Sequence, residues 1–190
     1  MIDRHLDDHL RTIARLRDHK ADIEAIAGLM IDCLASGGRI FWLGNGGSAA
    51  DSQHLASELV GRFERDRPGL ASLALTTDSS ALTAIGNDYG FDQIFARQVE
   101  ALCRPGDLVI GISTSGNSPN VLRALEKARA LGAMTAGFGG RGGGSLKGLV
   151  DACLIAPSDN TARIQEAHLL VGHILCDLVE AHFAPPAATV

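Results

Sequence analysis

Two glycine- and serine-rich segments are the residues of this chain best suited to bind an anion. The first is Gly44-Asn45-Gly46-Gly47-Ser48, and the second is Ser113-Thr114-Ser115-Gly116-Asn117-Ser118. Each follows an apolar run and precedes a helical pattern, so it directs free backbone N–H groups and hydroxyls beyond the end of a strand. Neither ends in the GK[ST] of a nucleotide P-loop. Together the segments predict a site for a phosphorylated small molecule.

Each segment also has an alternative interpretation. Gly44, Gly46 and Ala49 match the dinucleotide pattern G-x-G-x-x-A, which requires an acidic residue at the end of the second strand, about 20 positions later. The first candidate is Asp78, 34 positions after Gly44, and the pattern leaves the second segment unexplained. The second segment could merely cap a helix. Three consecutive hydroxyl side chains are more than helix capping requires. Pro119 suits a helix N-terminus left open for a ligand.

A second group of residues could bind a metal ion or transfer protons. His54 and Glu58 are four apart and share one face of a predicted helix. Together with His173, and with Gln165 as a weaker ligand, they would suit zinc. Gln165 and His173 are separated by about 12 Å along a helix, so both reach one ion only by leaning together or across a subunit contact. The spacing alone leaves a surface pair on an amphipathic helix as an open alternative.

Apolar runs alternate with helical patterns, which predicts a parallel sheet covered by helices on both faces. Both segments follow strands, and ligands of such sheets lie beyond the carboxyl ends of the strands. A turn is expected at Gly86-Asn87-Asp88, where Asp88 could bind a polyol hydroxyl. We expect strands at 39–43, 70–75, 107–112, 133–138 and 152–155, and helices at 48–64, 79–85, 91–102, 119–131 and 161–183.

Size and composition indicate one domain over residues 1–190, with 46% hydrophobic residues and 22 glycines. Residues 2–35 are expected to form helices whose apolar stripe needs a surface to pack against. A partner subunit would supply one, so we expect these helices to contribute to oligomerisation. A net charge of −5 gives no basic surface for nucleic acid or an anionic membrane. The four scattered cysteines form no CxxC pair, which favours reduced thiols and a cytoplasmic protein. The tail APPAATV is expected to be disordered.

Four stretches resemble the sugar-isomerase family of phosphosugar-binding domains. They are GNGGSAADSQHLASELVGRF, LTAIGNDYGFDQIFARQV, GDLVIGISTSGNSPNV and ARIQEAHLLVGHIL. The resemblance runs from the N-terminal helices to about Phe183. It implies an α/β fold, a flavodoxin-like three-layer sandwich with a five-stranded parallel sheet and extra N-terminal helices. It also implies a homotetramer with active sites near subunit contacts.

The resemblance further implies an activity. A ketose–aldose isomerase would convert D-sedoheptulose 7-phosphate to D-glycero-D-manno-heptose 7-phosphate through an enediol, for heptose and surface polysaccharide (lipopolysaccharide) biosynthesis. Glu58 and His173 would be the catalytic acid/base pair. One zinc per subunit would be held by His54, Glu58, Gln165 and His173. Substrate contacts would come from Asn45, Gly46, Gly47, Ser48, Glu58, Asn87, Asp88, Ser113, Thr114, Ser115, Ser118 and Gln165.

Two alternatives stay open at this point. One family relative is a non-enzymatic regulator that binds the replication initiator, and it lacks the glutamate and the second histidine. Because this chain has both Glu58 and His173, the enzyme is favoured. An isomerase of a shorter or an amino sugar phosphate would carry the same phosphate loops. Some family members also have an aspartate where this chain has Ala162, so any role of that aspartate does not apply here.

Overall fold

Five parallel strands form the sheet that carries the candidate site. In the computed structural model, which describes residues 1–185, the strand order is β2-β1-β3-β4-β5. The pairings β1–β2, β1–β3, β3–β4 and β4–β5 are all parallel. The strands are β1 (Ile40–Gly44), β2 (Ser72–Ala74), β3 (Leu108–Ser113), β4 (Met134–Gly139) and β5 (Ala152–Ile155). All but two residues of the tail APPAATV lie outside the described residues.

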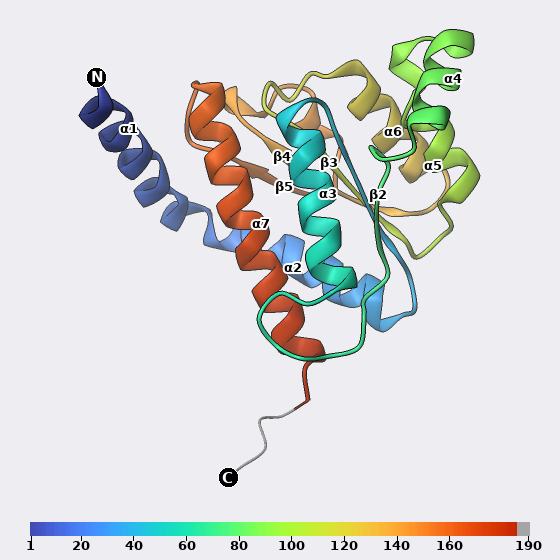
Figure 1. Cartoon of the computed structure of the whole chain (residues 1–190), viewed down its shortest axis with the longest axis horizontal. Coiled ribbons are helices and arrows are strands. Elements are labelled where there is room, and N and C mark those ends of the chain that lie inside the picture. Colours follow the sequence, from blue (N-terminus) through green and yellow to red (C-terminus); the bar gives the residue numbers. More distant parts are fainter. Residues whose placement is uncertain (186–190) are drawn as a thin grey trace.

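Helices cover both faces of the sheet, as Figure 1 shows. One face carries α2 (Lys20–Ala35), α3 (Gly47–Val60) and α7 (Thr161–Phe183), and the other carries α4 (Ser79–Tyr89), α5 (Ala96–Leu102) and α6 (Pro119–Ala130). Alternate residues of β1 enter opposite cores: Trp42 packs beneath α2, α3 and α7, and Phe41 packs beneath α5 and α6. The predicted three-layer α/β fold is therefore confirmed.

Four predicted strands agree with the structure to within one residue at each end, and β2 is shorter than expected. One turn prediction and two helix predictions are wrong. Gly86-Asn87-Asp88 is not a turn but part of the end of α4, which stops at Gly90, where φ is +89°. The helix expected over 48–64 ends at Val60, because the chain turns away at Gly61. The segment expected as one helix over 91–102 is a 3₁₀ turn, Phe91–Gln93, followed by α5.

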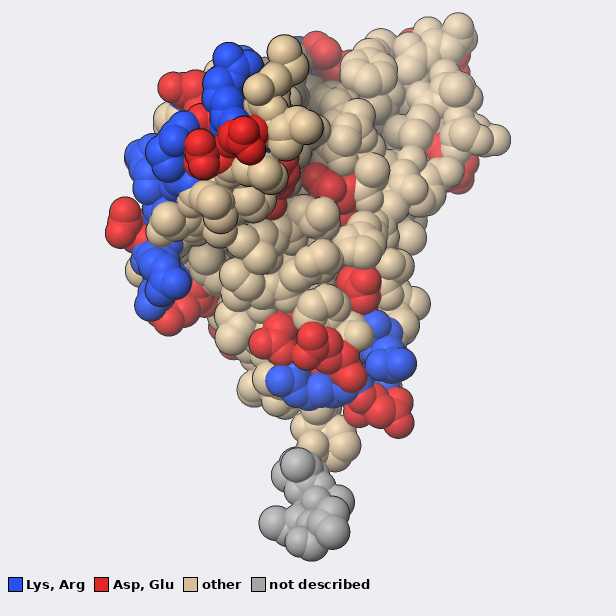
Figure 2. All heavy atoms as spheres, turned by 60° about the vertical axis from the view of Figure 1, so that its left-hand side comes forward, with Lys and Arg blue, Asp and Glu red and all other residues tan. Residues whose placement is uncertain are grey.

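The N-terminal helices precede the sheet. A 3₁₀ turn, Leu16–His19, joins α1 (Ile2–Arg15) to α2, and α1 extends away from the body of the molecule in Figure 1. Ile2, Leu6 and Leu10, spaced by four residues along α1, are 75%, 57% and 64% exposed. Figure 2 shows a broad area without charged side chains on the face that carries α1 and α7. Within residues 1–185, no helix is long and apolar enough to span a membrane.

Candidate active site

The two glycine- and serine-rich segments meet at the switch point of the sheet. From β1 the chain continues to β2 on one side, and β3 lies on the other, so the loops after β1 and β3 are neighbours. The first loop is bonded to the first turn of α6, which follows the second loop: Asn45 Nδ2 donates to Asn120 Oδ1 at 2.9 Å and Asn120 Nδ2 donates to Asn45 Oδ1 at 2.8 Å. The sequence-predicted juxtaposition of the segments is present in the structure.

Hydroxyl groups gather in the second segment. Ser113 Oγ lies 2.9 Å from Ser118 Oγ and 3.4 Å from Ser115 Oγ. Ser118 occupies the N-cap of α6 without a capping side-chain hydrogen bond, and Pro119 opens the helix. These hydroxyls therefore gather at the N-terminus of α6, where the helix dipole favours a phosphate. The N–H groups of Val121 and Leu122 in the first turn already donate to the carbonyl of Ser118. Thr114 is half-buried in the same loop.

Three of the predicted metal ligands form one cluster. His54, Glu58 and His173 each offer a ligand atom, and these atoms lie within 4.8 Å of one another. His54 Nε2 is 2.8 Å from His173 Nε2 and 3.5 Å from Glu58 Oε1. The two imidazole nitrogens and the carboxylate oxygen thus converge, and that donor set matches a zinc site. The cluster also places a carboxylate and an imidazole where both could exchange protons with one substrate.

The parallel course of α3 and α7 explains how residues distant in sequence meet. Contacts advance in the same direction along both helices, since the amide of Gln165 lies against Gly47 and Gly172 lies against Leu55. A Cβ added at Gly47 would be 2.2 Å from Gln165 Nε2. Gln165 therefore lies beside the first loop, and His173, two turns later, lies beside His54. Ser48 is 4% exposed at the first turn of α3.

Gly172 sets the separation of α3 and α7 at the cluster. A Cβ there would be 2.5 Å from a methyl carbon of Leu55, which is fully buried. We expect Gly172→Ala to lower the free energy of unfolding, since overpacking costs about 1–3 kcal/mol and alanine recovers only about 0.8–1 kcal/mol of helix propensity. The matched control is Gly28→Ala in α2, where a Cβ meets no atom within 4 Å. Urea denaturation of both variants makes the comparison, and equal stabilities would contradict it.

The Asn45–Asn120 pair is expected to couple the two loops energetically. Asn120 is 1% exposed, and its Oδ1 also accepts from the backbone N–H of Val121. Asn45→Ala and Asn120→Ala each leave an amide unpaired, whereas the double variant leaves none. A double-mutant cycle of unfolding free energies should therefore give a coupling of about 0.5–3 kcal/mol. Additive losses would show that the pair has no role in joining the loops.

Asn87 and Asp88 lie apart from these groups. Both are exposed at the end of α4, and Asn87 Nδ2 donates to Asp88 Oδ1 at 2.7 Å. A hollow of about 420 Å³ opens beside Asn45 and Gly46 and is lined by Gly86 among other residues. The structure thus brings this helix end toward the first loop, and neither Asn87 nor Asp88 is among the described residues that line the hollow.

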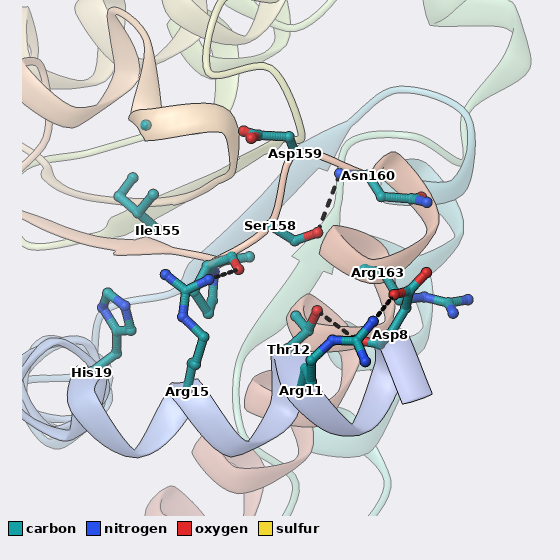
Figure 3. A pocket seen from close by; sticks show the side chains of 13 residues that line it. Asp8, Arg11, Thr12, Arg15, His19, Ile155, Ser158, Asp159, Asn160 and Arg163 are labelled. Atoms are coloured by element: carbon teal, nitrogen blue, oxygen red, sulfur yellow. Dashed lines mark hydrogen bonds and ion pairs between the residues drawn. The ribbon is translucent and has the colours of Figure 1, made fainter. Parts of the chain in front are cut away.

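A larger hollow of about 690 Å³ lies between α1 and the segment before α7 (Figure 3). Its arginines already donate to protein oxygens: Arg11 to Asp8, Arg15 to the carbonyl of Pro157, and Arg163 to the carbonyl of His5. Among the residues that the structure describes, none of the predicted site residues lines it. This hollow is therefore separate from the candidate site.

Burial shifts several titratable groups near the sheet. Desolvation raises the pKa of Asp51, one turn before His54 on α3, and the nearby His54 opposes this shift. Desolvation lowers the pKa of His168 to about 4, although its Nε2 lies 2.9 Å from the carbonyl of Gly139. All four cysteines are free, and burial raises their pKa values to about 11 or 12. They are therefore poor nucleophiles.

Sequence reasoning missed four residues that support the site. Asn120 joins the loops, Phe63 stacks on His173, and the buried pair of Arg67 and Glu180 holds the segment that follows α3. Only Glu180 carries a signal in the sequence, because it is a charged residue that follows Val171, Leu175, Cys176 and Val179 on the buried face of the last helix. The other three act through tertiary contacts that helical periodicity does not reveal.

The comparisons with known proteins agree with this architecture. The sequence model of the SIS domain matches residues 4–140. The chain therefore belongs to the SIS domain family. A crystal structure described as the sugar isomerase domain of a transcription factor from Sphaerobacter thermophilus has a TM-score of 0.69 at 17% identity over 96% of this chain and 91% of its own. At that identity it supports the fold alone.

Nearer relatives are phosphoheptose isomerases. The one from Paramagnetospirillum magneticum is 54% identical over 97% of this chain and 96% of its own length. The one from Solidesulfovibrio magneticus is 61% identical over 86% of this chain and 79% of its own length. The structure of the phosphoheptose isomerase from Neisseria gonorrhoeae has a TM-score of 0.90 at 43% identity and covers 95% of this chain and 97% of its own.

Proposed function

We propose that the chain has phosphoheptose isomerase activity and converts D-sedoheptulose 7-phosphate to D-glycero-D-manno-heptose 7-phosphate. One observation carries the proposal: the first glycine-rich loop and the cluster of His54, Glu58 and His173 lie along the same two helices, α3 and α7, and the serine loop lies next to the first loop, where Asn45 pairs with Asn120 of α6. The high identity to named phosphoheptose isomerases supports the choice of sugar. The product would enter heptose and lipopolysaccharide biosynthesis.

The serine loop holds the end of the substrate that does not react. Hydroxyls of Ser113, Ser115 and Ser118 at the N-terminus of α6 donate to the phosphate, with Thr114 and Ser48 nearby. Asn45, Gly46, Gly47, Gln165, Asn87 and Asp88 complete the proposed substrate contacts. Fixing the phosphate converts its binding energy into placement of the distant carbonyl at Glu58 and His173.

Glu58 and His173 exchange the protons of the isomerisation. One of them takes a proton from C1, next to the ketose carbonyl, while the carbonyl oxygen on C2 gains a proton, and an enediol forms. The other returns a proton to C2 while the hydroxyl on C1 loses its proton, which leaves the aldose. General acid–base assistance of this kind contributes about 10²–10⁴-fold to the rate. A carboxylate bound to a metal ion is a weak base, so Glu58 acts as ligand and as base at different stages or holds only one of the roles.

The convergent donors fit one zinc ion per subunit. His54 and His173 present their Nε2 atoms to each other at 2.8 Å, close enough for both to bind one ion. Glu58 supplies the anionic ligand, and Gln165 is the proposed fourth ligand. When bound, zinc would polarise the substrate carbonyl as a Lewis acid.

The first test follows formation of the aldose from sedoheptulose 7-phosphate by the purified chain, before and after chelation. We expect turnover that a chelator abolishes and zinc restores. Turnover that is indifferent to the chelator would remove zinc from the proposal and leave the isomerase. A folded protein without turnover in either state would contradict the isomerase and favour the regulator that binds the replication initiator, although Glu58 and His173 count against it.

We propose that the chain is one domain that assembles as a homotetramer in the cytoplasm, with residues 2–35 in the contacts. The exposed apolar residues support this. Leu170, Ile174 and Leu178 form a stripe on α7, each 37–38% exposed, beside a hollow lined by Ile13 and Ile23 from the N-terminal helices. Sedimentation equilibrium should give four chains for the wild type and fewer for Ile174→Glu, and a monomeric wild type would contradict the assembly.

A further inference from the structure

The segment that follows α3 is tied to α7 by one buried carboxylate. Glu180 is fully buried, two turns after His173. Its Oε1 accepts from the backbone N–H of Phe63 at 2.9 Å, and its Oε2 accepts from those of Glu64 and Arg65 at 2.7 and 2.6 Å. Three charge-assisted hydrogen bonds to successive N–H groups fix the backbone of this segment in one conformation.

Arg67 extends this anchor to the end of α3. Its Nε lies 3.3 Å from Glu180 Oε1, and both side chains are fully buried. The guanidinium also donates to the backbone carbonyls of Glu58 and Leu59, at 2.8 and 2.7 Å, in the last turn of α3. Burial alone would raise the pKa of Glu180, but the three N–H donors and Arg67 hold it below its usual value, so the carboxylate stays ionised.

The anchored segment places an aromatic ring on the candidate metal cluster. The ring of Phe63 stacks on His173, with centroids 5.4 Å apart and an angle of 25° between the planes. His173 in turn meets His54 at a centroid distance of 5.1 Å and a steep angle of 72°. The imidazole of His173 is thus bounded on one face by Phe63 while its Nε2 is directed at His54.

We propose that Phe63, held by Glu180 and Arg67, is a positioning residue that fixes the ring of His173 for metal binding. The inference rests on the proposed function for its zinc ion. A stacked ring limits rotation of the imidazole about its side-chain torsions, so less conformational freedom is lost when the ligand binds the ion. Groups that orient a metal ligand without touching the ion typically change metal affinity by about 10–100-fold.

The test compares zinc affinities, measured by competition with a chromophoric chelator, for wild type, Phe63→Leu and Phe63→Tyr. Leucine keeps apolar volume but removes the ring, and we expect zinc to bind about 10-fold more weakly. Tyrosine keeps the ring, and we expect it to retain wild-type affinity. A role in packing alone would not distinguish the two variants in this way. Cobalt(II) absorption spectra of the same proteins report whether the ligand geometry changes.

Phe183→Leu is the matched control, because its ring contacts a histidine outside the cluster, His182, at a centroid distance of 4.9 Å. This variant should bind zinc as the wild type does. Equal affinities for Phe63→Leu and wild type, or a wild type that binds no zinc, would overturn the inference. A wild type that binds zinc without isomerising the sugar would refute the proposed function and leave the inference to be decided by the affinities. Glu180→Gln is a second variant, expected to weaken zinc binding in the same direction as Phe63→Leu.

Discussion

Glu58→Gln is expected to lower kcat by about 10²–10⁴-fold, the contribution of a positioned acid or base. The substitution keeps the shape of the side chain but removes its basicity and its charge. Within residues 1–185, the carboxylate of Glu58 forms an ion pair with His54 alone. The backbone carbonyl of Glu58 accepts from Arg67, and the substitution leaves that hydrogen bond in place. The fold should therefore survive. KM should change little, because the phosphate is held by the serine loop.

The same variant separates the two roles proposed for Glu58. If Glu58 is chiefly the base, zinc content should be retained while turnover falls. If it is chiefly a ligand, zinc affinity and turnover should fall together, and excess zinc should restore part of the rate. Glu126→Gln on the exposed face of α6 is the matched control and should leave kcat unchanged. A Glu58→Gln variant that turns over at the wild-type rate would contradict both roles.

The layout of the sheet could be predicted because its strands are continuous apolar runs that alternate with helical patterns. The bounds expected for α7 agree with the structure, since Asn160 caps its start with a hydrogen bond to the N–H of Ala162. Local signals failed where a helix end depends on tertiary contacts. The residues after Val60 have helical character in the sequence, but Glu180 binds the N–H groups of Phe63, Glu64 and Arg65.

The candidate site was predictable in its residue types but not in its geometry. Gln165 and His173 are eight positions apart, and in the sequence this spacing argues against their binding one ion. The sequence does not show where α3 lies relative to them. In the structure, the two helices run side by side, so Gln165 meets Gly47 and His173 meets His54. Helical periodicity gives the face on which a residue lies, whereas the pairing of faces depends on packing such as that of Gly172 against Leu55.

Gly116→Ala is expected to cause the largest loss of phosphate binding among single substitutions of the serine loop. Gly116 has a φ of +67°, and a Cβ there would be 2.0 Å from the carbonyl oxygen of Gly143. That neighbour is a backbone atom, which cannot rotate away as a side chain can. The N–H of Leu146 also donates to the carbonyl of Gly116 at 3.0 Å, so the loop after β3 is in direct contact with the segment after β4. The added methyl must displace one of them.

Displacement of the serine loop would misplace Ser115 and Ser118 relative to the N-terminus of α6. Losing one hydrogen bond to a charged phosphate costs about 1.5–3 kcal/mol, which is about 10–100-fold in KM. Gly142→Ala is the matched control, because its φ is +80° but a Cβ there meets no atom within 4 Å. It carries only the conformational cost of about 1–2 kcal/mol in unfolding free energy.

Inhibition by inorganic phosphate, measured beside KM and urea denaturation, distinguishes a local effect from a general one. We expect Gly116→Ala to weaken phosphate inhibition in parallel with the rise in KM, whereas Gly142→Ala should lose stability without changing either constant. Equal phosphate affinity in the two variants would mean that the close approach of Gly116 to Gly143 serves stability alone. Phosphate would then have to be held elsewhere than in the loop after β3.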